Sequence, residues 1–266
     1  MVDFGILLAR DERAIRNPLG AGSMPLWDLV GKVLKKPLYQ LLGGKEMQHV
    51  PCYDGSIYFS DLLPQYVNRW QDRFKEEIDL GFRRGHRAFN IKIGRGAKWM
   101  PADEGYARDK DVLQLIRRHA GAEILLGADA NDGYSLELTK RLLSDLPDYQ
   151  FEFLEEMFPE NVDQYLQLKD FLSQHRLKTL IADGEGQSKL EGLMPFLQTR
   201  SVDVYQADMN RFGFEGILQE AASVGTRGFI GPHNWGSLVG FYMILHTGGR
   251  LQISTGRRMI RLTAIY

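Results

Sequence analysis

The sequence has 266 residues, 44% of them hydrophobic and 25% charged, and a formal net charge of −1. This is the composition of an ordinary soluble globular protein, and a chain so close to neutral lacks the global basic field that attracts nucleic acid or anionic lipid. Cys52 is the only cysteine, so an intrachain disulfide is excluded and a reducing compartment is expected.

The amino-terminal segment has only a short apolar run after Asp3, without the basic start and the long hydrophobic stretch of a signal peptide. No apolar stretch approaches the roughly 20 residues that a membrane span requires. We therefore expect a cytoplasmic protein with neither a membrane nor a nucleic-acid partner. A homo-oligomer is compatible with these features, and none of them decides for or against it.

Residues 1–48 are predicted to form an irregular lead, one helix and a closing turn. Within 24–34 the apolar residues fall at 26, 29, 30, 33 and 34, which is the spacing of one helical face. Gly43 and Gly44 close a second short turn that follows Pro37.

From His49 onward, short apolar runs alternate with longer amphipathic segments. The predicted strands are His49–Tyr53, Ala88–Ile93, Glu123–Ala128, Tyr149–Leu154, Thr179–Ala182, Val202–Gln206, Gly228–Gly231 and Leu251–Ser254. The predicted helices are 63–78, 103–119, 135–145, 161–175, 189–198, 213–224 and 237–247. Because each strand is followed by a helix over a short connection, the strands are expected to be parallel and joined by right-handed crossovers. Eight such strands favour a closed α/β barrel, and a doubly wound open sheet is the alternative.

Ionisable side chains end six successive predicted strands. They are Lys92, Asp129, Glu155, Glu185, Asp208 and His233, at intervals of 23 to 37 residues. A barrel of about 250 residues with eight units predicts a period of about 30, and its catalytic groups come from the carboxyl ends of the strands. The pattern therefore predicts that these six residues face one mouth of the barrel.

The chemical types of these residues agree with one another. Three carboxylates, Asp129, Glu155 and Glu185, make an all-oxygen ligand set that suits Mg²⁺, with Mn²⁺ as the alternative. Lys92 and His233 are candidate acid/base groups beside that metal. Asp208 is expected to fix the tautomer of the histidine.

Simpler interpretations remain for individual residues. A single Asp or Glu after a strand is often a helix cap, and Glu156 and Asp183 are interpreted as supporting residues, with Asp183 the alternative to Glu185 as third ligand. The segments Gly94-Arg-Gly96 and Gly184-Glu-Gly186 do not continue into a phosphate-binding motif and are interpreted as tight turns.

These motifs resemble the mandelate racemase and muconate lactonizing enzyme branch of the enolase superfamily, from about Pro25 to His246. The segments 26–32 and 37–44 are similar to the family's junction between its capping domain and its barrel. Asp129-Ala-Asn131, Glu155-Glu156 and Gly184-Glu185 resemble its three metal-ligand motifs. Asp208 and His233 resemble the His–Asp dyad of the racemase-like subgroup.

The resemblance implies a TIM-like (β/α)7β barrel that uses Mg²⁺, with Asp129, Glu155 and Glu185 as ligands. It also implies that Lys92, His233 and Asp208 are catalytic and that Asn90 and Asn131 bind a small carboxylate substrate. The implied reaction removes the α-proton of this carboxylate through an enediolate.

The chain departs from the family at three places. The family often has Lys-x-Lys at the second strand, whereas this sequence has Asn90-Ile-Lys92. The single lysine favours a dehydratase, which converts a sugar acid to a 2-keto-3-deoxy acid, over a racemase or epimerase of a 2-hydroxy acid. Most of the family's capping domain has no counterpart, and residues 249–258 do not match the eighth strand. We therefore expect a capping-domain remnant (1–48), a barrel (49–250) and an atypical tail (251–266), and a non-catalytic metal-binding barrel stays an alternative.

Overall fold

The computed structural model describes residues 20–44, 50–234, 238–255 and 264–265. The chain divides into two compact units, which are considered separately below. The first unit contains residues 52–182 and Ile265, and the second contains the described residues before 52 and from 183 to 264. Within the described part of the chain, no helix is both long enough and apolar enough to cross a membrane.

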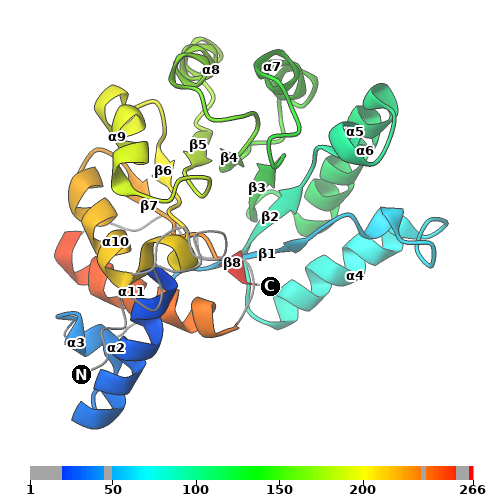
Figure 1. The fold of residues 1–266 in the computed structure, drawn as a ribbon. Helices are drawn as coiled ribbons and strands as arrows, with labels where there is room; N and C mark the ends of the chain where they lie inside the picture. Colours follow the sequence, from blue (N-terminus) through cyan, green and yellow to red (C-terminus); the bar gives the residue numbers. More distant parts are fainter. Residues whose placement is uncertain (1–19, 45–49, 235–237, 256–263, 266) are drawn as a thin grey trace. The chain divides into compact units, whose positions relative to one another are not determined.

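The first unit is built on parallel strands that are neighbours in chain order (Figure 1). They are β1 (Tyr53–Ile57), β2 (Ala88–Lys92), β3 (Leu125–Asp129), β4 (Phe153–Glu155) and the first three residues of β5 (Leu180–Asp183). The register pairs Lys92 with Asp129 and Asp129 with Glu155. Because of this register, the carboxyl ends of β2, β3 and β4 are level, and their last side chains are neighbours.

The helices of the first unit follow these strands. They are the 3₁₀ helix η1 (Ser60–Leu62), α4 (Trp70–Arg83), α5 (Arg95–Lys98), α6 (Ala102–Ala120), α7 (Leu136–Asp145) and α8 (Val162–Gln174). Each long helix buries one apolar face; in α4 this face contains Phe74 and Ile78, which are fully buried. Burial of such a side chain contributes about 1.5–3 kcal/mol. The Ser135 hydroxyl caps α7 by accepting a hydrogen bond from the Leu138 amide.

The second unit repeats the strand–helix alternation. It contains α2 (Gly20–Leu34), α3 (Leu38–Leu41), α9 (Leu190–Thr199), β6 (Val204–Tyr205), α10 (Met209–Val224), β7 (Phe229–Ile230) and α11 (Leu238–Thr255). A further short strand, β8, is Ala264–Ile265. Strands β6 and β7 are parallel, and the amide of Gln206 donates to the carbonyl of Asp183 at the end of β5.

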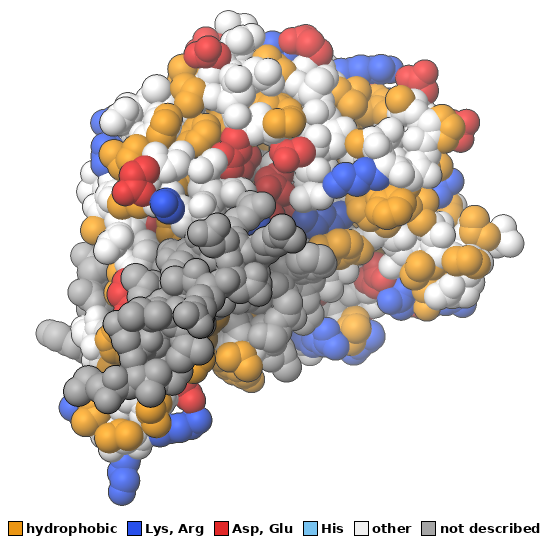
Figure 2. All heavy atoms as spheres, in the orientation of Figure 1, with side chains coloured by type: hydrophobic (Ala, Val, Ile, Leu, Met, Phe, Trp, Pro, Cys, Tyr) orange, Lys and Arg blue, Asp and Glu red, His pale blue; other side chains and the backbone are white. Residues whose placement is uncertain are grey.

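Helix α2 packs closely against α10 at a kink. Gly213 has φ +63°, and a Cβ there would lie 2.6 Å from the Ser23 hydroxyl and 2.7 Å from the Gly20 carbonyl. Only glycine adopts this conformation without strain and admits the approach. The outer face of α2 is exposed, and it consists of the apolar residues that the sequence placed on one face: Leu26, Leu29, Val30, Val33 and Leu34. Figure 2 shows hydrophobic side chains together with basic side chains (Lys or Arg) at the lower left.

The predicted elements from β2 to β7 are confirmed to within a few residues, and three predictions are wrong. The first strand is Tyr53–Ile57, whereas the prediction was His49–Tyr53; residues 50–52 are not part of a strand, and His49 lies outside the described residues. Helix α4 begins at Trp70 and not at Leu63, because Leu63 precedes a proline and is extended. Residues Leu251–Ser254 continue α11 and form no strand; a short apolar run does not distinguish strand from helix.

Candidate active site

Lys92 and Asp129 form an ion pair at the carboxyl ends of β2 and β3. Asp129 is fully buried, and Lys92 is 9% exposed. Burial lowers the pKa of Lys92, but the negative charges of Asp129 and Glu155 outweigh it and raise the pKa above its usual value. The lysine is therefore an ammonium in this arrangement.

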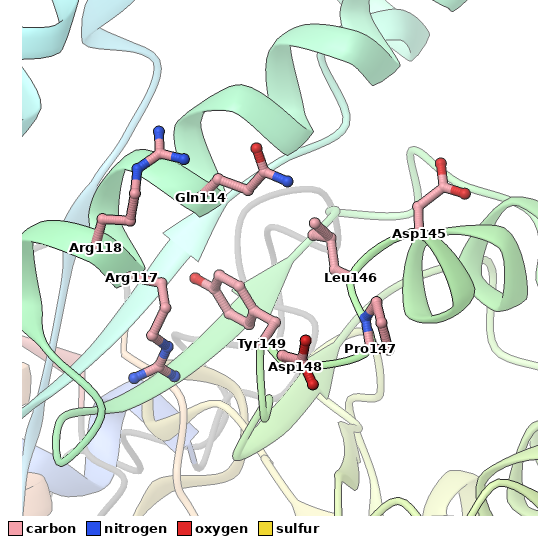
Figure 3. A pocket seen from close by; sticks show the side chains of 8 residues that line it. All are labelled: Gln114, Arg117, Arg118, Asp145, Leu146, Pro147, Asp148 and Tyr149. Carbon is pink, nitrogen blue, oxygen red and sulfur yellow. The ribbon is translucent and has the colours of Figure 1, made fainter.

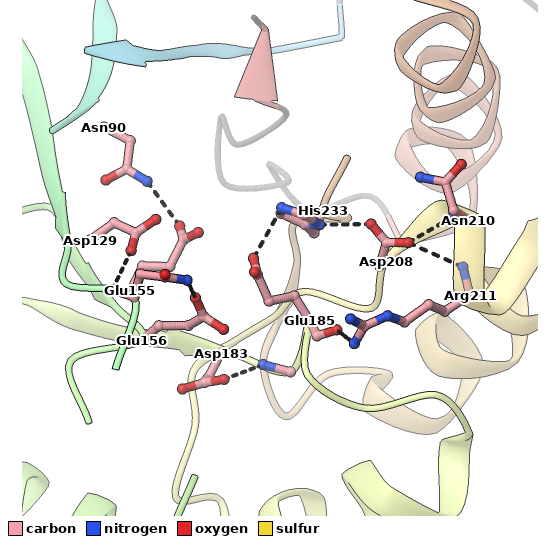
Figure 4. Close-up of polar contacts among 12 residues, drawn as sticks. Asn90, Asp129, Glu155, Glu156, Asp183, Glu185, Asp208, Asn210, Arg211 and His233 are labelled. Atoms are coloured by element: carbon pink, nitrogen blue, oxygen red, sulfur yellow. Dashed lines mark hydrogen bonds and ion pairs between the residues drawn. The ribbon is translucent and has the colours of Figure 1, made fainter. Parts of the chain in front are cut away.

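Glu155 ends β4, next to Asp129, and is 2% exposed. Its Oε2 accepts a hydrogen bond from Nδ2 of Asn90 at 3.0 Å (Figure 4). The same oxygen accepts from the Tyr53 hydroxyl at 3.4 Å. Asn90, predicted as a substrate-binding residue, thus orients a predicted metal ligand. Tyr53 was not predicted as a site residue; it was the last residue of the predicted strand and is the first residue of β1.

Asn131 lies in the turn after Asp129 and has φ +45°. Its amide donates to Oδ1 of Asp129 at 2.8 Å. Its side chain donates to Glu156 at 3.0 Å and accepts from Lys98 at 2.7 Å. Burial, with repulsion from Asp129, raises the pKa of Glu156. Glu156 therefore acts as a support for the turn, as the sequence suggested, and Lys98 is a contact that the sequence did not reveal.

In the second unit, His233 lies between two carboxylates. Its Nδ1 is 2.7 Å from Oδ2 of Asp208, and its Nε2 is 3.1 Å from Oε2 of Glu185 (Figure 4). The three side chains are 9–17% exposed. The sequence predicted that Asp208 and His233 form a pair. The backbones of these two residues form a parallel β-bridge, which places their side chains next to each other. Each ring nitrogen of His233 therefore has a carboxylate partner, and the two carboxylates fix the orientation of the imidazole.

Asp208 and Arg211 connect this histidine to helix α10. Oδ1 of Asp208 caps the helix by accepting from the amides of Asn210 and Arg211 at 2.8 and 3.1 Å. The Arg211 guanidinium donates to the carbonyl of Glu185. Arg211 therefore links the segment of Glu185 to the start of the helix capped by Asp208, a role that no sequence motif indicated.

Glu220, on the same helix, is fully buried. Its Oε1 accepts from the amide of Ala207 at 3.1 Å, and its Oε2 has no hydrogen-bond partner within the described residues. Burial raises the pKa of Glu220 to about 8. The carboxyl group thus supports the residue that precedes Asp208. The signal that could have revealed it is the helical spacing of Glu220 from Ile217 and Val224, which places the glutamate on the apolar face.

The donor chemistry of the predicted ligands fits a hard divalent cation. Asp129 and Glu155 are adjacent buried carboxylates in the first unit, and Glu185 is a carboxylate of the second unit. Oxygen donors of this kind are the ligands that magnesium prefers. Among the described residues, no three His, Cys, Asp or Glu side chains are grouped as a metal site. The ligand assignment, including the choice of Glu185 over Asp183, therefore stays a prediction.

A separate pocket of about 280 Å³ lies in the first unit, lined by residues of α6 and the α7–β4 connection (Figure 3). Arg117 lies 4.9 Å from the ring centre of Tyr149 and donates to the carbonyl of Ile124 at 2.7 Å. Ile124 precedes β3, so the pocket is at the amino ends of the strands. Catalytic residues of barrels lie at the opposite ends.

Parallel strands, each followed by a helix and with ionisable residues at their carboxyl ends, are the arrangement of a (β/α)-barrel domain. The family model described as enolase C-terminal domain-like matches residues 73–258. The chain therefore belongs to this family, in the branch of mandelate racemase and muconate lactonizing enzyme.

Three similar proteins illustrate the relationship. The arabinonate dehydratase of Saccharolobus solfataricus is 28% identical over 221 residues, which cover 83% of this chain and 51% of the relative. The galacturonate dehydratase of a Geobacillus species, solved with D-galacturonate and 5-keto-4-deoxy-D-galacturonate, is 34% identical with a TM-score of 0.77. A mandelate racemase/muconate lactonizing protein from Geobacillus, solved with magnesium and tartrate, is also 34% identical, with a TM-score of 0.76. Both structural matches cover 85% of this chain and 60% of the other.

These matches confirm the predicted fold class, a TIM-like barrel. The chain spans about half the length of the curated relatives it matches. The activity and the substrate of the whole protein are therefore treated as proposals.

Proposed function

We propose that the chain is the barrel part of a metal-dependent dehydratase, which converts a sugar acid to a 2-keto-3-deoxy acid. The main support is the position of His233, whose ring is held by Asp208 on one side and faces Glu185 on the other. An imidazole oriented by a carboxylate is suited to moving a proton at its second nitrogen. The relatives named as arabinonate and galacturonate dehydratases support the reaction type.

Asp129, Glu155 and Glu185 would hold magnesium, with manganese as the alternative. When bound, the cation would neutralise the substrate carboxylate and stabilise the negative charge that develops as the α-proton leaves. Asn90 and Tyr53 would keep Glu155 oriented. Asn131, held between Glu156 and Lys98, would lie beside the substrate.

Lys92 and His233 would divide the proton transfers. One of them removes the proton from C2, and the other donates a proton to the hydroxyl that leaves C3 as water. The enol that results gains a proton at C3 and becomes the 2-keto-3-deoxy acid. Asp208 would keep Nδ1 of the histidine protonated, so that Nε2 takes or gives the proton.

The same two residues could instead serve a racemase or epimerase, which needs an acid/base group on each face of the α-carbon. A hydrophobic dipeptide epimerase of Roseobacter litoralis, 29% identical over 149 residues, makes this the second candidate. Incubation in deuterium oxide separates the two: the epimerase reaction incorporates deuterium at the α-carbon and releases no water.

The test is a magnesium titration followed by a screen of aldonic and aldaric acids for 2-keto product, with and without chelator. We expect magnesium binding, and metal-dependent product that is lost in His233→Asn. The matched control is His175→Asn, at an exposed histidine of the first unit. Magnesium binding without product or α-proton exchange would favour the non-catalytic barrel. Product that persists in chelator or in His233→Asn would contradict the proposal.

A further inference from the structure

The first unit contains an arginine that is completely buried between two carboxylates. Nε and Nη2 of Arg95 donate to the two oxygens of Asp61 at 2.9 and 2.7 Å, and Nη1 donates to Oδ1 of Asp109 at 2.6 Å. The side chains of all three residues are 0% exposed. Arg95 is the first residue of α5, in the segment that the sequence indicated only as a tight turn.

The network is attached to the backbone that directly follows Lys92. Nη1 of Arg95 lies 3.4 Å from the carbonyl of Lys92 and donates to it. Oδ2 of Asp109 accepts from the amides of Gly94 and Arg95 at 2.8 and 3.3 Å. One guanidinium and one carboxylate therefore hold both sides of the turn that ends β2.

The same turn packs on the loop that follows Asp129. Gly94 has φ +96°, and a Cβ there would lie 2.7 Å from the carbonyl of Ala130. Tyr134, from that loop, donates its hydroxyl to Oδ2 of Asp109 at 3.0 Å. The network thus joins the segments that carry the two partners of the Lys92–Asp129 ion pair.

The surroundings of Arg95 make the network costly to bury. The rings of Phe59 and Phe74 lie 4.8 and 5.9 Å from the guanidinium carbon. Burial lowers the pKa of Arg95. Hydrogen bonds and negative charge from Asp61 and Asp109 raise this pKa by more than burial lowers it, so the guanidinium stays charged. A buried ion network of this kind contributes little more to stability than well-packed apolar residues would. A role in fixing local geometry explains it better than a role in stability.

We infer that Arg95, with Asp61 and Asp109, is a positioning residue that sets where Lys92 ends β2, and thereby aims the lysine ammonium at Asp129 and the substrate. This inference rests on the proposed function, in which Lys92 transfers a proton. Arg95 itself touches neither substrate nor metal in this scheme.

The test compares two variants of the network with a matched control. Arg95→Lys keeps the charge and loses the bidentate fork, and Asp109→Asn weakens the hold on the Gly94 amide. The control is Arg108→Met, because Arg108 also contacts Asp61, at 3.3 Å, but is partly exposed and packs over the ring of Trp70 in α4. Each variant is measured for thermal unfolding, for amide hydrogen exchange of the segment 92–98 and for kcat and KM.

In folded Arg95→Lys and Asp109→Asn, we expect amide exchange in 92–98 to rise at least tenfold. The value of kcat should fall at least thirtyfold, with KM within threefold, because the substrate is still bound while the lysine is misplaced. Arg108→Met should match the wild type in all three measurements. If Arg95→Lys does not fold, Asp109→Asn decides the question alone.

Unchanged exchange in 92–98, or a kcat within threefold of the wild type in the folded variants, would overturn the inference. An equal fall of kcat in Arg108→Met would also overturn it, since the effect would then be general loss of packing. If the wild type turns over no acid, the proposed function fails, and the exchange measurement still decides whether the network holds the turn.

Discussion

Asp208 divides its two carboxylate oxygens between a helix and a histidine. Oδ1 accepts from the first amides of α10, and Oδ2 lies 2.7 Å from Nδ1 of His233. The side chain that fixes the imidazole is therefore itself fixed by a helix terminus. Because the two oxygens have separate partners, substitutions can separate the structural role from the catalytic one.

Asp208→Asn should lower kcat at least about 100-fold, which is the size of effect typical of general acid–base catalysis. The free energy of unfolding should fall by less than about 1 kcal/mol, because Asn caps helices as well as Asp does. Steady-state kinetics and urea unfolding check both values. Ser135→Ala is the matched control, since it removes the cap of α7 alone. It should cost about 1 kcal/mol and leave turnover unchanged. A full-rate Asp208→Asn variant would remove the dyad from the mechanism.

Lys92→Met should abolish turnover and change how stability responds to magnesium. Without the ammonium, the buried Asp129 carboxylate loses its counter-charge, which costs about 3–5 kcal/mol in metal-free protein. Saturating magnesium should restore most of this loss, because the cation replaces the missing charge. Thermal unfolding with and without magnesium measures the effect. Lys98→Met, at an exposed lysine that contacts Asn131, should show no such difference. A Lys92→Met variant as stable as the wild type without metal would contradict the argument.

Glu155→Gln should weaken magnesium binding at least about tenfold, since one of three proposed anionic ligands becomes neutral. Asn90 and Tyr53 can still hold the amide oxygen, so the fold should be retained. Isothermal titration calorimetry measures the affinity. Asp132→Asn is the control, because Asp132 is an exposed acid near the same site. Equal affinities in Glu155→Gln and the wild type would place the metal elsewhere.

Glu220 should make the protein less stable as the pH rises. Its pKa is about 8 in the folded protein against an ordinary value of 4.5, so between these two values the folded state binds more protons than the unfolded state. Stability from this group is therefore greatest below pH 4.5 and is lost as the pH rises toward 8. Glu220→Gln removes this pH dependence. The free energy of unfolding of the variant, relative to that of the wild type, should therefore increase by a few kcal/mol as the pH rises from 5 to 8.

Urea unfolding at the two pH values tests this expectation, with Glu191→Gln, at an exposed glutamate of α9, as the control. A parallel pH response in Glu220→Gln and the wild type would show that Glu220 is ionised in the folded state.

The sequence was sufficient to predict which residues after consecutive strands become neighbours, while their roles stay predictions. Asp208 and His233 come after β6 and β7, and the parallel pairing of these strands places their ends side by side. Lys92, Asp129 and Glu155 are related in the same way by the register of β2, β3 and β4. Strand periodicity fixes such neighbours without any knowledge of the packing between helices and strands.

The supporting residues could not be predicted, because their partners depend on tertiary packing. Arg95 lies 34 residues from Asp61 and 14 from Asp109, and neither spacing corresponds to a periodic pattern. Glu220 is the exception, because its spacing from Ile217 and Val224 already places it on the buried face of α10; what the spacing does not reveal is its partner, the amide of Ala207. Arg211 reaches the backbone of Glu185, and a backbone partner leaves no trace in residue types.

The exposed apolar face of α2 has a practical consequence for handling the protein. Leu29 and Val33 are 56% and 71% exposed, and they lie one helical turn apart. On a phenyl-substituted column the purified chain should therefore elute late, at low salt. Replacing both residues with glutamine should shorten the retention without affecting the fold, because side chains this open to water contribute little packing. The double variant is accordingly the better starting material for concentrated samples.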